Sequence, residues 1–279
     1  MTMIHFGKTA ADYARYRVPF SPELFARLAR FGIVVAAQKV LDVGAGTGLL
    51  GNALQARGCD VTLLDVSADL LEACSLARVL RGEGSSESRL DAAVGCTNAS
   101  NPSPRSTEER GIIVARAEEL PFADHVFDLV TAGQCWHWFD RHAAPREILR
   151  VLVPGGHIAV VYQTYIPLPG SIAEQTEQVI LRHRPGWRHA NSTGINGQVL
   201  RDLQINRFVE IESFSFDISI DFTRESWRGY IRTTSAVGAS MNPQLLSVFD
   251  SEHASLLQDF AEPFPIPHRV FAAVARKPV

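Results

Sequence analysis

Between residues 39 and 162, short apolar runs alternate with amphipathic segments. The apolar runs predict strands at Lys39–Val43, Val61–Leu64, Ile112–Ala115, Phe127–Ala132 and Ile158–Tyr162. The amphipathic segments predict helices at Leu49–Arg57, Ala68–Leu80 and Pro145–Leu152, the last ended by Pro154-Gly155-Gly156. Strands that are apolar throughout and alternate with helices are typical of a parallel sheet with helices on both faces. The pattern therefore predicts a doubly wound α/β fold.

A further helix is predicted before this core. Ser21 has the side chain of a helix N-cap, and Pro22 suits the first helical position. The helix should run to about Phe31, and its apolar face carries Leu24, Phe25 and Leu28.

The last third of the chain has a different pattern. Val209–Ile220 alternates and predicts a strand, His268–Arg276 predicts a final strand, and Thr223–Thr234 and Pro243–Phe260 predict helices. We expect the two strands at a sheet edge and the helices as a cover. The chain would then consist of an N-terminal segment and core at 1–163, a helical cover at 164–206 and 221–265, and late strands at 207–220 and 266–279.

The stretch Arg81–Arg110 interrupts the alternation. It is rich in Ser, Gly, Asn and Pro, and a connection of about thirty residues without regular structure is unusual inside a domain. We expect an exposed, mobile insertion. An ordered lid is the alternative, but the stretch offers few large apolar anchors.

Composition narrows the function classes. The net charge of −3 and pI of about 6.3 give no footprint for nucleic acid. The sequence contains no run of eighteen apolar residues, so no membrane span is predicted. The N-terminus lacks the pattern of a secretory signal. The cysteines lack metal-ligand spacing, so we expect no metal and free thiols in a reducing cytoplasm. They are Cys59, Cys74, Cys96 and Cys135.

The strongest motif is the glycine-rich turn Asp42–Gly48, which follows a predicted strand and opens a predicted helix. Alternate glycines permit a sharp turn and close approach of a ligand, and the helix N-terminus offers free N–H groups. The dinucleotide fingerprint needs glycine where the chain has Leu49, and no phosphate-loop Gly-Lys-Ser/Thr follows. The carboxylate of Asp42 suits a ligand with an ammonium group. A plain strand-to-helix turn is the structural alternative.

Two weaker signals follow in order. Asp65 ends the second core strand, where a carboxylate in a doubly wound sheet reaches ribose hydroxyls. Its alternative role is to stabilise the next helix N-terminus. After the third strand, the backbone amide of Ala117 and the carboxylate of Glu118 could meet an adenine edge.

Together, the motifs resemble those of the class I S-adenosylmethionine-dependent methyltransferases, most closely methyltransferase type 11 and trans-aconitate methyltransferase-like proteins. The motifs are Asp42–Gly48, Asp65, Ala117–Phe122, Phe127–Val130 and Pro154–Gly156. The resemblance covers about Phe6–Tyr162 without the insertion. It implies a Rossmann-like, seven-stranded, mostly parallel sheet whose last strand is antiparallel.

The resemblance also implies the cofactor S-adenosylmethionine. Asp42 and the glycine turn would hold its methionine part, Asp65 its ribose, and Ala117 and Glu118 its adenine. The full predicted set of cofactor contacts is Asp42, Gly44, Ala45, Gly46, Thr47, Asp65, Val66, Leu70, Ala117, Glu118 and Gln134.

The acceptor side is predicted at two places. Gln134–Phe139 follows the fourth strand at the sheet edge where ligands bind, and His137 there is the candidate general base. A structural histidine under a lid is the alternative. We expect Tyr13, Arg17, Trp138 and Tyr162 to contact the acceptor. Arg17 would pair with a carboxylate, and the alternative is an amphipathic N-terminal helix with a snorkelling arginine.

These signals predict a methyltransferase that acts on a small molecule. The acceptor atom stays open between carboxylate or hydroxyl oxygen and carbon, and a role in secondary metabolism is an expectation only. A nicotinamide-dependent oxidoreductase is disfavoured by Leu49 and Asp42. A non-catalytic nucleoside-binding module would keep the turn but lack an enclosed acceptor pocket. A homo-oligomer is neither favoured nor excluded.

Overall fold

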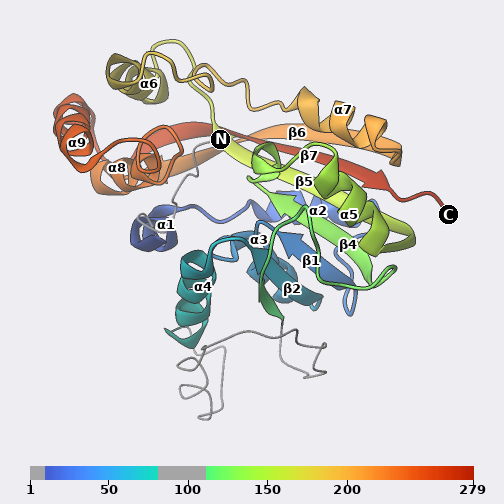
Figure 1. The fold of residues 1–279 in the computed structure, drawn as a ribbon. Helices are drawn as coiled ribbons and strands as arrows, with labels where there is room; N and C mark the ends of the chain where they lie inside the picture. The colour runs from blue at the N-terminus through green and yellow to red at the C-terminus, as the bar shows by residue number, and fades with distance from the viewer. Residues whose placement is uncertain (1–9, 81–110) are drawn as a thin grey trace.

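A computed structural model of the chain describes residues 10–80 and 111–279. Its centre is one seven-stranded sheet (Figure 1). The strands are β1 (Lys39–Val43), β2 (Asp60–Asp65), β3 (Ile112–Val114), β4 (Phe127–Gly133), β5 (Leu152–Tyr165), β6 (Val209–Phe222) and β7 (Phe264–Arg276). The predicted insertion at 81–110 and Cys96 lie outside the described residues.

The strand order is β3-β2-β1-β4-β5-β7-β6. Strands β1 to β5 pair in parallel, and β7 runs antiparallel to both β5 and β6. The order reverses between β1 and β4, which is the place where ligands bind in open α/β sheets. The structure therefore confirms the predicted doubly wound sheet and its antiparallel last strand.

Helices cover both faces of this sheet and form a separate layer over one end of it (Figure 1). They are α1 (Ala10–Tyr16), α2 (Pro22–Ala29), α3 (Leu49–Gln55), α4 (Ala68–Leu80), α5 (Ala143–Val151), α6 (Ile172–His183), α7 (Gly197–Ile205), α8 (Arg224–Arg232) and α9 (Pro243–Leu257). At α2 the hydroxyl of Ser21 accepts a hydrogen bond from the backbone N–H of Glu23 at 3.3 Å, which confirms the predicted cap.

One predicted boundary is wrong. Pro154-Gly155-Gly156 does not follow the helix as a turn, because α5 ends at Val151 and these residues lie within β5. The positive φ of Gly155, +74°, belongs to an irregular register between β4 and β5. The backbone of Gly155 and Gly156 hydrogen-bonds with that of Lys277 at 3.2 and 2.8 Å, so the C-terminal chain holds this segment extended.

Three apolar clusters hold the layers together. One face of the sheet packs on α5 and α7 through residues that include Leu41, Val130, Ile148, Val199 and Leu203. The other face packs on α2, α3 and α4 through residues that include Val40, Leu129, Leu24, Leu54 and Leu71. A third cluster joins α6, α8 and α9 to the far ends of β6 and β7, with Trp227 and Phe249 fully buried.

The N-terminal helix α1 is fastened to α8 of this third layer. Arg232 Nε donates to Asp12 Oδ2 at 2.8 Å. The ring of Tyr16 lies so close to Gly229 that a Cβ there would stand 2.3 Å from ring carbons. These contacts join residues more than two hundred positions apart and bring the residues after α1 over the sheet. No helix within the described ranges is long and apolar enough to cross a membrane.

Candidate functional site

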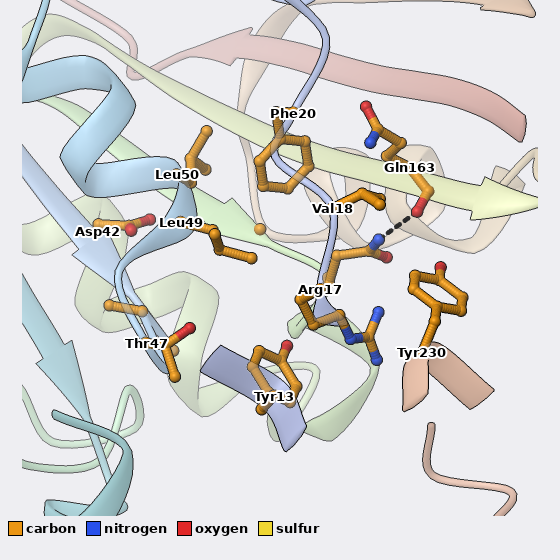
Figure 2. Close-up of a pocket in the computed structure, with 14 residues that line it drawn as sticks. Tyr13, Arg17, Val18, Phe20, Asp42, Thr47, Leu49, Leu50, Gln163 and Tyr230 are labelled. Atoms are coloured by element: carbon orange, nitrogen blue, oxygen red, sulfur yellow. Dashed lines mark hydrogen bonds between the residues drawn. The ribbon is translucent and has the colours of Figure 1, made fainter. Parts of the chain in front are cut away.

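A cavity opens at the carboxyl ends of β1 and β4, with about 490 Å³ of empty space that is partly open to solvent (Figure 2). The glycine turn and the end of β4 form one wall. The segment after α1, Gln163 of β5 and Tyr230 of α8 form the other (Figure 2). The lining residues are Tyr13, Arg17, Val18, Phe20, Asp42, Gly44, Ala45, Thr47, Leu49, Leu50, Gly133, Gln134, Gln163 and Tyr230.

The glycines of the turn serve different purposes. Gly44, Gly46 and Gly48 all have positive φ, between +56° and +76°, which disfavours any other residue. A Cβ on Gly44 would lie 2.7 Å from Cys135 Sγ, and one on Gly48 would lie 2.5 Å from Cys74 Sγ. A Cβ on Gly46 would meet nothing within 4 Å. Protein packing therefore demands glycine at 44 and 48, whereas Gly46 faces open space.

Asp42 stands at the base of the cavity with its carboxylate 1% exposed. Its Oδ1 accepts from Thr131 Oγ1 at 2.7 Å, and its Oδ2 accepts from the N–H of Gly51 at 2.9 Å. Burial raises the pKa of Asp42 to about 7, although both hydrogen bonds act in the opposite direction. The group is therefore poised to gain or lose a proton close to neutral pH.

One hydroxyl in the turn lacks a partner. Thr47 Oγ1 is buried and makes no hydrogen bond within the described structure, and Thr47 lines the cavity. A buried hydroxyl without a partner is costly, so its position favours a ligand that supplies one.

Asp65 fastens the turn from the side of β2. Its Oδ2 accepts from the N–H of Gly46, and its Oδ1 accepts from the N–H of Ser67, both at 2.8 Å. Burial raises the pKa of Asp65 above its usual range. Nearby, Val66 is 65% exposed and Leu70 is buried. None of the three lines the cavity itself.

Ala117 and Glu118 lie in the loop after β3. Ala117 is buried, and Glu118 Oε1 accepts from the N–H of Asp140 at 2.9 Å. Arg116 forms an ion pair with the same carboxylate at 3.3 Å. This loop is thereby joined to the loop after β4, away from the lining of the cavity.

The segment after β4 makes a 3-10 turn at Trp136–Trp138. His137 Nδ1 and the hydroxyl of Tyr162 lie 3.2 Å apart, and Trp138 is 39% exposed. Desolvation of the ring and the positive charges of His189 and Arg17 lower the pKa of His137 to about 4. The imidazole of His137 is therefore neutral at pH 7.

The turn Trp136–Trp138 is stabilised by hydrogen bonds to Asp202 of α7, which is 1% exposed. Its carboxylate accepts from Trp136 Nε1 at 3.1 Å and from Arg141 Nε at 2.8 Å. Gln198 Nε2 donates to it at 2.8 Å as well. Sequence reasoning missed this network, whose partners are 61 and 66 positions apart.

The predicted residues therefore fall into separate groups. Those that line the cavity are Tyr13, Arg17, Asp42, Gly44, Ala45, Thr47 and Gln134. His137, Trp138 and Tyr162 form a neighbouring group. Sequence reasoning missed Gln163, whose amide accepts from the N–H of Ser21 and donates to the carbonyl of Pro19, both at 2.9 Å. The available signal was a polar residue directly after an apolar strand run.

Comparisons with known proteins agree with this architecture. Residues 41–160 match the model of a methyltransferase domain family. An uncharacterized methyltransferase of Mycobacterium tuberculosis is 34% identical over 161 residues, or 58% of this chain and 53% of the relative. A malonyl-[acyl-carrier protein] O-methyltransferase of Methylococcus capsulatus is 26% identical over 75% of this chain and 66% of its own length. The chain thus spans about half the length of the mycobacterial relative.

Solved structures share the fold. The YcgJ protein of Bacillus subtilis superposes with a TM-score of 0.54 at 16% identity, over 93% of this chain and all of that one. Residues 41–160 are thus similar to a methyltransferase domain, and the sheet has the Rossmann-like fold of solved methyltransferase-like structures. S-adenosylmethionine is the cofactor of methyltransferases with this fold.

Proposed function

We propose that this chain transfers the methyl group of S-adenosylmethionine to a small molecule bound between the sheet and the segment after α1. The observation that carries the proposal is the cavity, which begins at the glycine turn and continues to Arg17 and Tyr230. A non-catalytic nucleoside-binding module needs only the first of these walls. The cofactor supplies an electrophilic methyl group on a sulfonium, and the protein contributes alignment and exclusion of water.

Features of the turn support its assignment as the methionine-binding part. The open space at Gly46 and the unpartnered hydroxyl of Thr47 both suit a ligand. Asp42 offers a carboxylate with a pKa near 7, which a neighbouring cation would draw to the ionised form. We assign Gly44, Ala45 and Gln134 to the same part.

The residues beyond the turn are proposed to hold the nucleoside. Asp65 lies at the end of β2 and can accept from ribose hydroxyls once its bonds to Gly46 and Ser67 adjust. Val66 and Leu70 would flank the nucleoside, and Ala117 and Glu118 would meet the adenine.

His137 and Tyr162 are proposed as the polar pair on the acceptor side. A neutral imidazole is able to take a proton, but its lowered pKa makes it a weak base. An acceptor oxygen that is already ionised needs no base, only alignment. The relative from Methylococcus capsulatus is by name an O-methyltransferase, which supports an oxygen acceptor. Trp138 would border the same space.

Calorimetry tests the cofactor assignment. We expect S-adenosylhomocysteine to bind and NADH not to bind. Asp65→Ala should weaken the affinity for S-adenosylhomocysteine by at least about tenfold, since charged hydrogen bonds contribute about 1.5–3 kcal/mol each. Asp69→Ala, an exposed carboxylate on the adjacent helix, is the matched control and should change nothing. Binding of NADH in place of S-adenosylhomocysteine would refute the assignment.

Turnover separates an enzyme from a binding module. Methyl transfer should be detected from labelled S-adenosylmethionine in a screen of carboxylic acids, phenols and indoles. Failure with all three classes, by protein that binds the cofactor, would contradict the proposal. His137→Ala should slow transfer to a phenol more than transfer to a carboxylate. A cytoplasmic location and the absence of a nucleic-acid partner stay predictions.

A further inference from the structure

We propose that Arg17 is the carboxylate receptor of the cavity, and that the ligand bound beside the glycine turn presents a carboxylate to its guanidinium. The inference rests on the proposed function only in that the cavity is the ligand site. It assigns a chemical group to the side of the cavity opposite the glycine turn.

The position of Arg17 is set by aromatic contacts on both sides. Its guanidinium carbon lies 4.8 Å from the ring centroid of Tyr13 and 5.1 Å from that of Tyr230 (Figure 2). Cation–π contacts with two rings hold the guanidinium in place. The side chain is therefore preorganised to receive a planar anion through paired N–H groups.

The polar partners of Arg17 within the described structure are uncharged. Its Nη2 donates to the carbonyl of Thr233 at 3.2 Å, and it shares a hydrogen bond with the phenol of Tyr230. Its Nε is buried and has no hydrogen-bond partner. A buried guanidinium N–H without an acceptor is costly, and a charged donor is the costliest kind to leave unpaired.

Neighbouring arginines show the contrast. Arg15, two positions earlier, pairs with Glu225 at 2.8 Å, and Arg232 pairs with Asp12 and Asp250 at 2.8 and 3.1 Å. Among the residues that the structure describes, Arg17 forms no ion pair. The two carboxylates beside Arg232 already neutralise its charge, so it is not free to bind an anionic ligand.

The described lining of the cavity holds one acidic side chain, which is already hydrogen-bonded within the protein. Asp42 is the single carboxylate in the described lining, and both of its oxygens accept hydrogen bonds from Thr131 and Gly51. The positive charge of Arg17 acts on its neighbours: it adds to the lowering of the His137 pKa that burial causes, and it opposes the rise that burial causes in the pKa of Tyr230. Asp42, with a pKa of about 7, is only partly ionised at neutral pH, so it only partly offsets the fixed cation, and the cavity attracts an anion.

Two ligands in the proposed reaction could supply the carboxylate. One is the methionine end of S-adenosylmethionine, and the other is an anionic acceptor. The two sources can be separated because 5′-methylthioadenosine shares the nucleoside and thioether of S-adenosylhomocysteine but lacks its amino acid part.

The test is calorimetry with the 279-residue chain, as wild type and as Arg17→Gln. The probes are S-adenosylhomocysteine, methylthioadenosine, and malonate or benzoate titrated into protein saturated with S-adenosylhomocysteine. Loss of a charge-assisted hydrogen bond should weaken a carboxylate probe by about 10- to 100-fold. If Arg17→Gln loses affinity for S-adenosylhomocysteine but not for methylthioadenosine, the carboxylate belongs to the cofactor. If it loses affinity only for malonate or benzoate, the carboxylate belongs to the acceptor.

Two variants provide controls. Arg15→Gln removes a paired, exposed arginine near the end of α1, two positions before Arg17, and should leave every affinity unchanged. Arg17→Lys should restore part of the loss because it keeps the charge without the fork. Equal weakening of S-adenosylhomocysteine and methylthioadenosine, or no weakening of any carboxylate probe, overturns the assignment. Failure of the wild type to bind S-adenosylhomocysteine would instead count against the proposed function.

Discussion

Replacing Asp42 with Asn should stabilise the ligand-free protein, and the gain should grow with pH. Asn keeps the size of the side chain, and its oxygen can accept the N–H of Gly51, which now reaches Oδ2 at 2.9 Å. The hydroxyl of Thr131, 2.7 Å from Oδ1, can rotate to accept from the new amide. The substitution therefore removes the titrating group with little change in packing.

The magnitude follows from linkage. Asp42 titrates at about 7 in the folded protein, against 3.8 for the ordinary group. Each pKa unit corresponds to about 1.4 kcal/mol, so the ionised form costs about 4 kcal/mol well above pH 7. Between about pH 4 and 7 the native state holds a proton that the unfolded chain has released, so stability falls as pH rises through this window. The cost grows by about 2–3 kcal/mol from pH 5 to pH 8.

Urea unfolding at pH 5 and pH 8 measures this difference for wild type and Asp42→Asn. The stability gain of the variant should be larger at pH 8 than at pH 5 by about 2–3 kcal/mol, and its affinity for S-adenosylhomocysteine should fall. Asp60→Asn, an exposed carboxylate at the start of β2, is the control and should show no such difference. If Asp42→Asn has the same pH dependence as wild type, the carboxylate is ionised at pH 5 and the reasoning about its burial is wrong.

Three further predictions follow from the packing of the site. Gly46→Ala should lower the free energy of unfolding by about 1–2 kcal/mol, because the residue has a positive φ. Gly44→Ala should lower it by at least about 1 kcal/mol more, because the new Cβ would lie 2.7 Å from the sulfur of Cys135. Equal losses in urea unfolding would contradict the packing argument. Asp202→Asn should lower the free energy of unfolding by about 1–3 kcal/mol and slow methyl transfer, since the turn after β4 loses its brace; unchanged stability and turnover would count against this role. Gly229→Ala should detach α1 from α8, seen as faster trypsin cleavage within α1, and an unaltered cleavage rate would show that the close contact is dispensable.

Much of the sheet could be read from the sequence because its determinants are local. An apolar run between turn residues specifies a buried strand in five or six positions, and the predictions for β1, β2 and β4 agree with the structure to within about two residues. The prediction failed at the start of β5, where Pro154-Gly155-Gly156 is typical of a turn. Pairing with the backbone of Lys277 makes that segment extended, and a partner 121 or more positions away leaves no local mark.

The site likewise has a part that is predictable from local sequence. The turn Asp42–Gly48 can be recognised in the sequence because positive φ and close approach require glycine regardless of the surrounding structure. The sequence could not distinguish the glycine that faces open space from the two that are required by packing.

Arg17 and Tyr230 were visible as residues but not as neighbours. By itself the sequence determined the glycine-turn wall of the cavity, since a strand, a glycine turn and a helix N-terminus are encoded within a few consecutive positions. Only the tertiary structure decided the opposite wall. It is built where the ring of Tyr16 packs on Gly229, and that contact depends on complementary shape between segments distant in the chain.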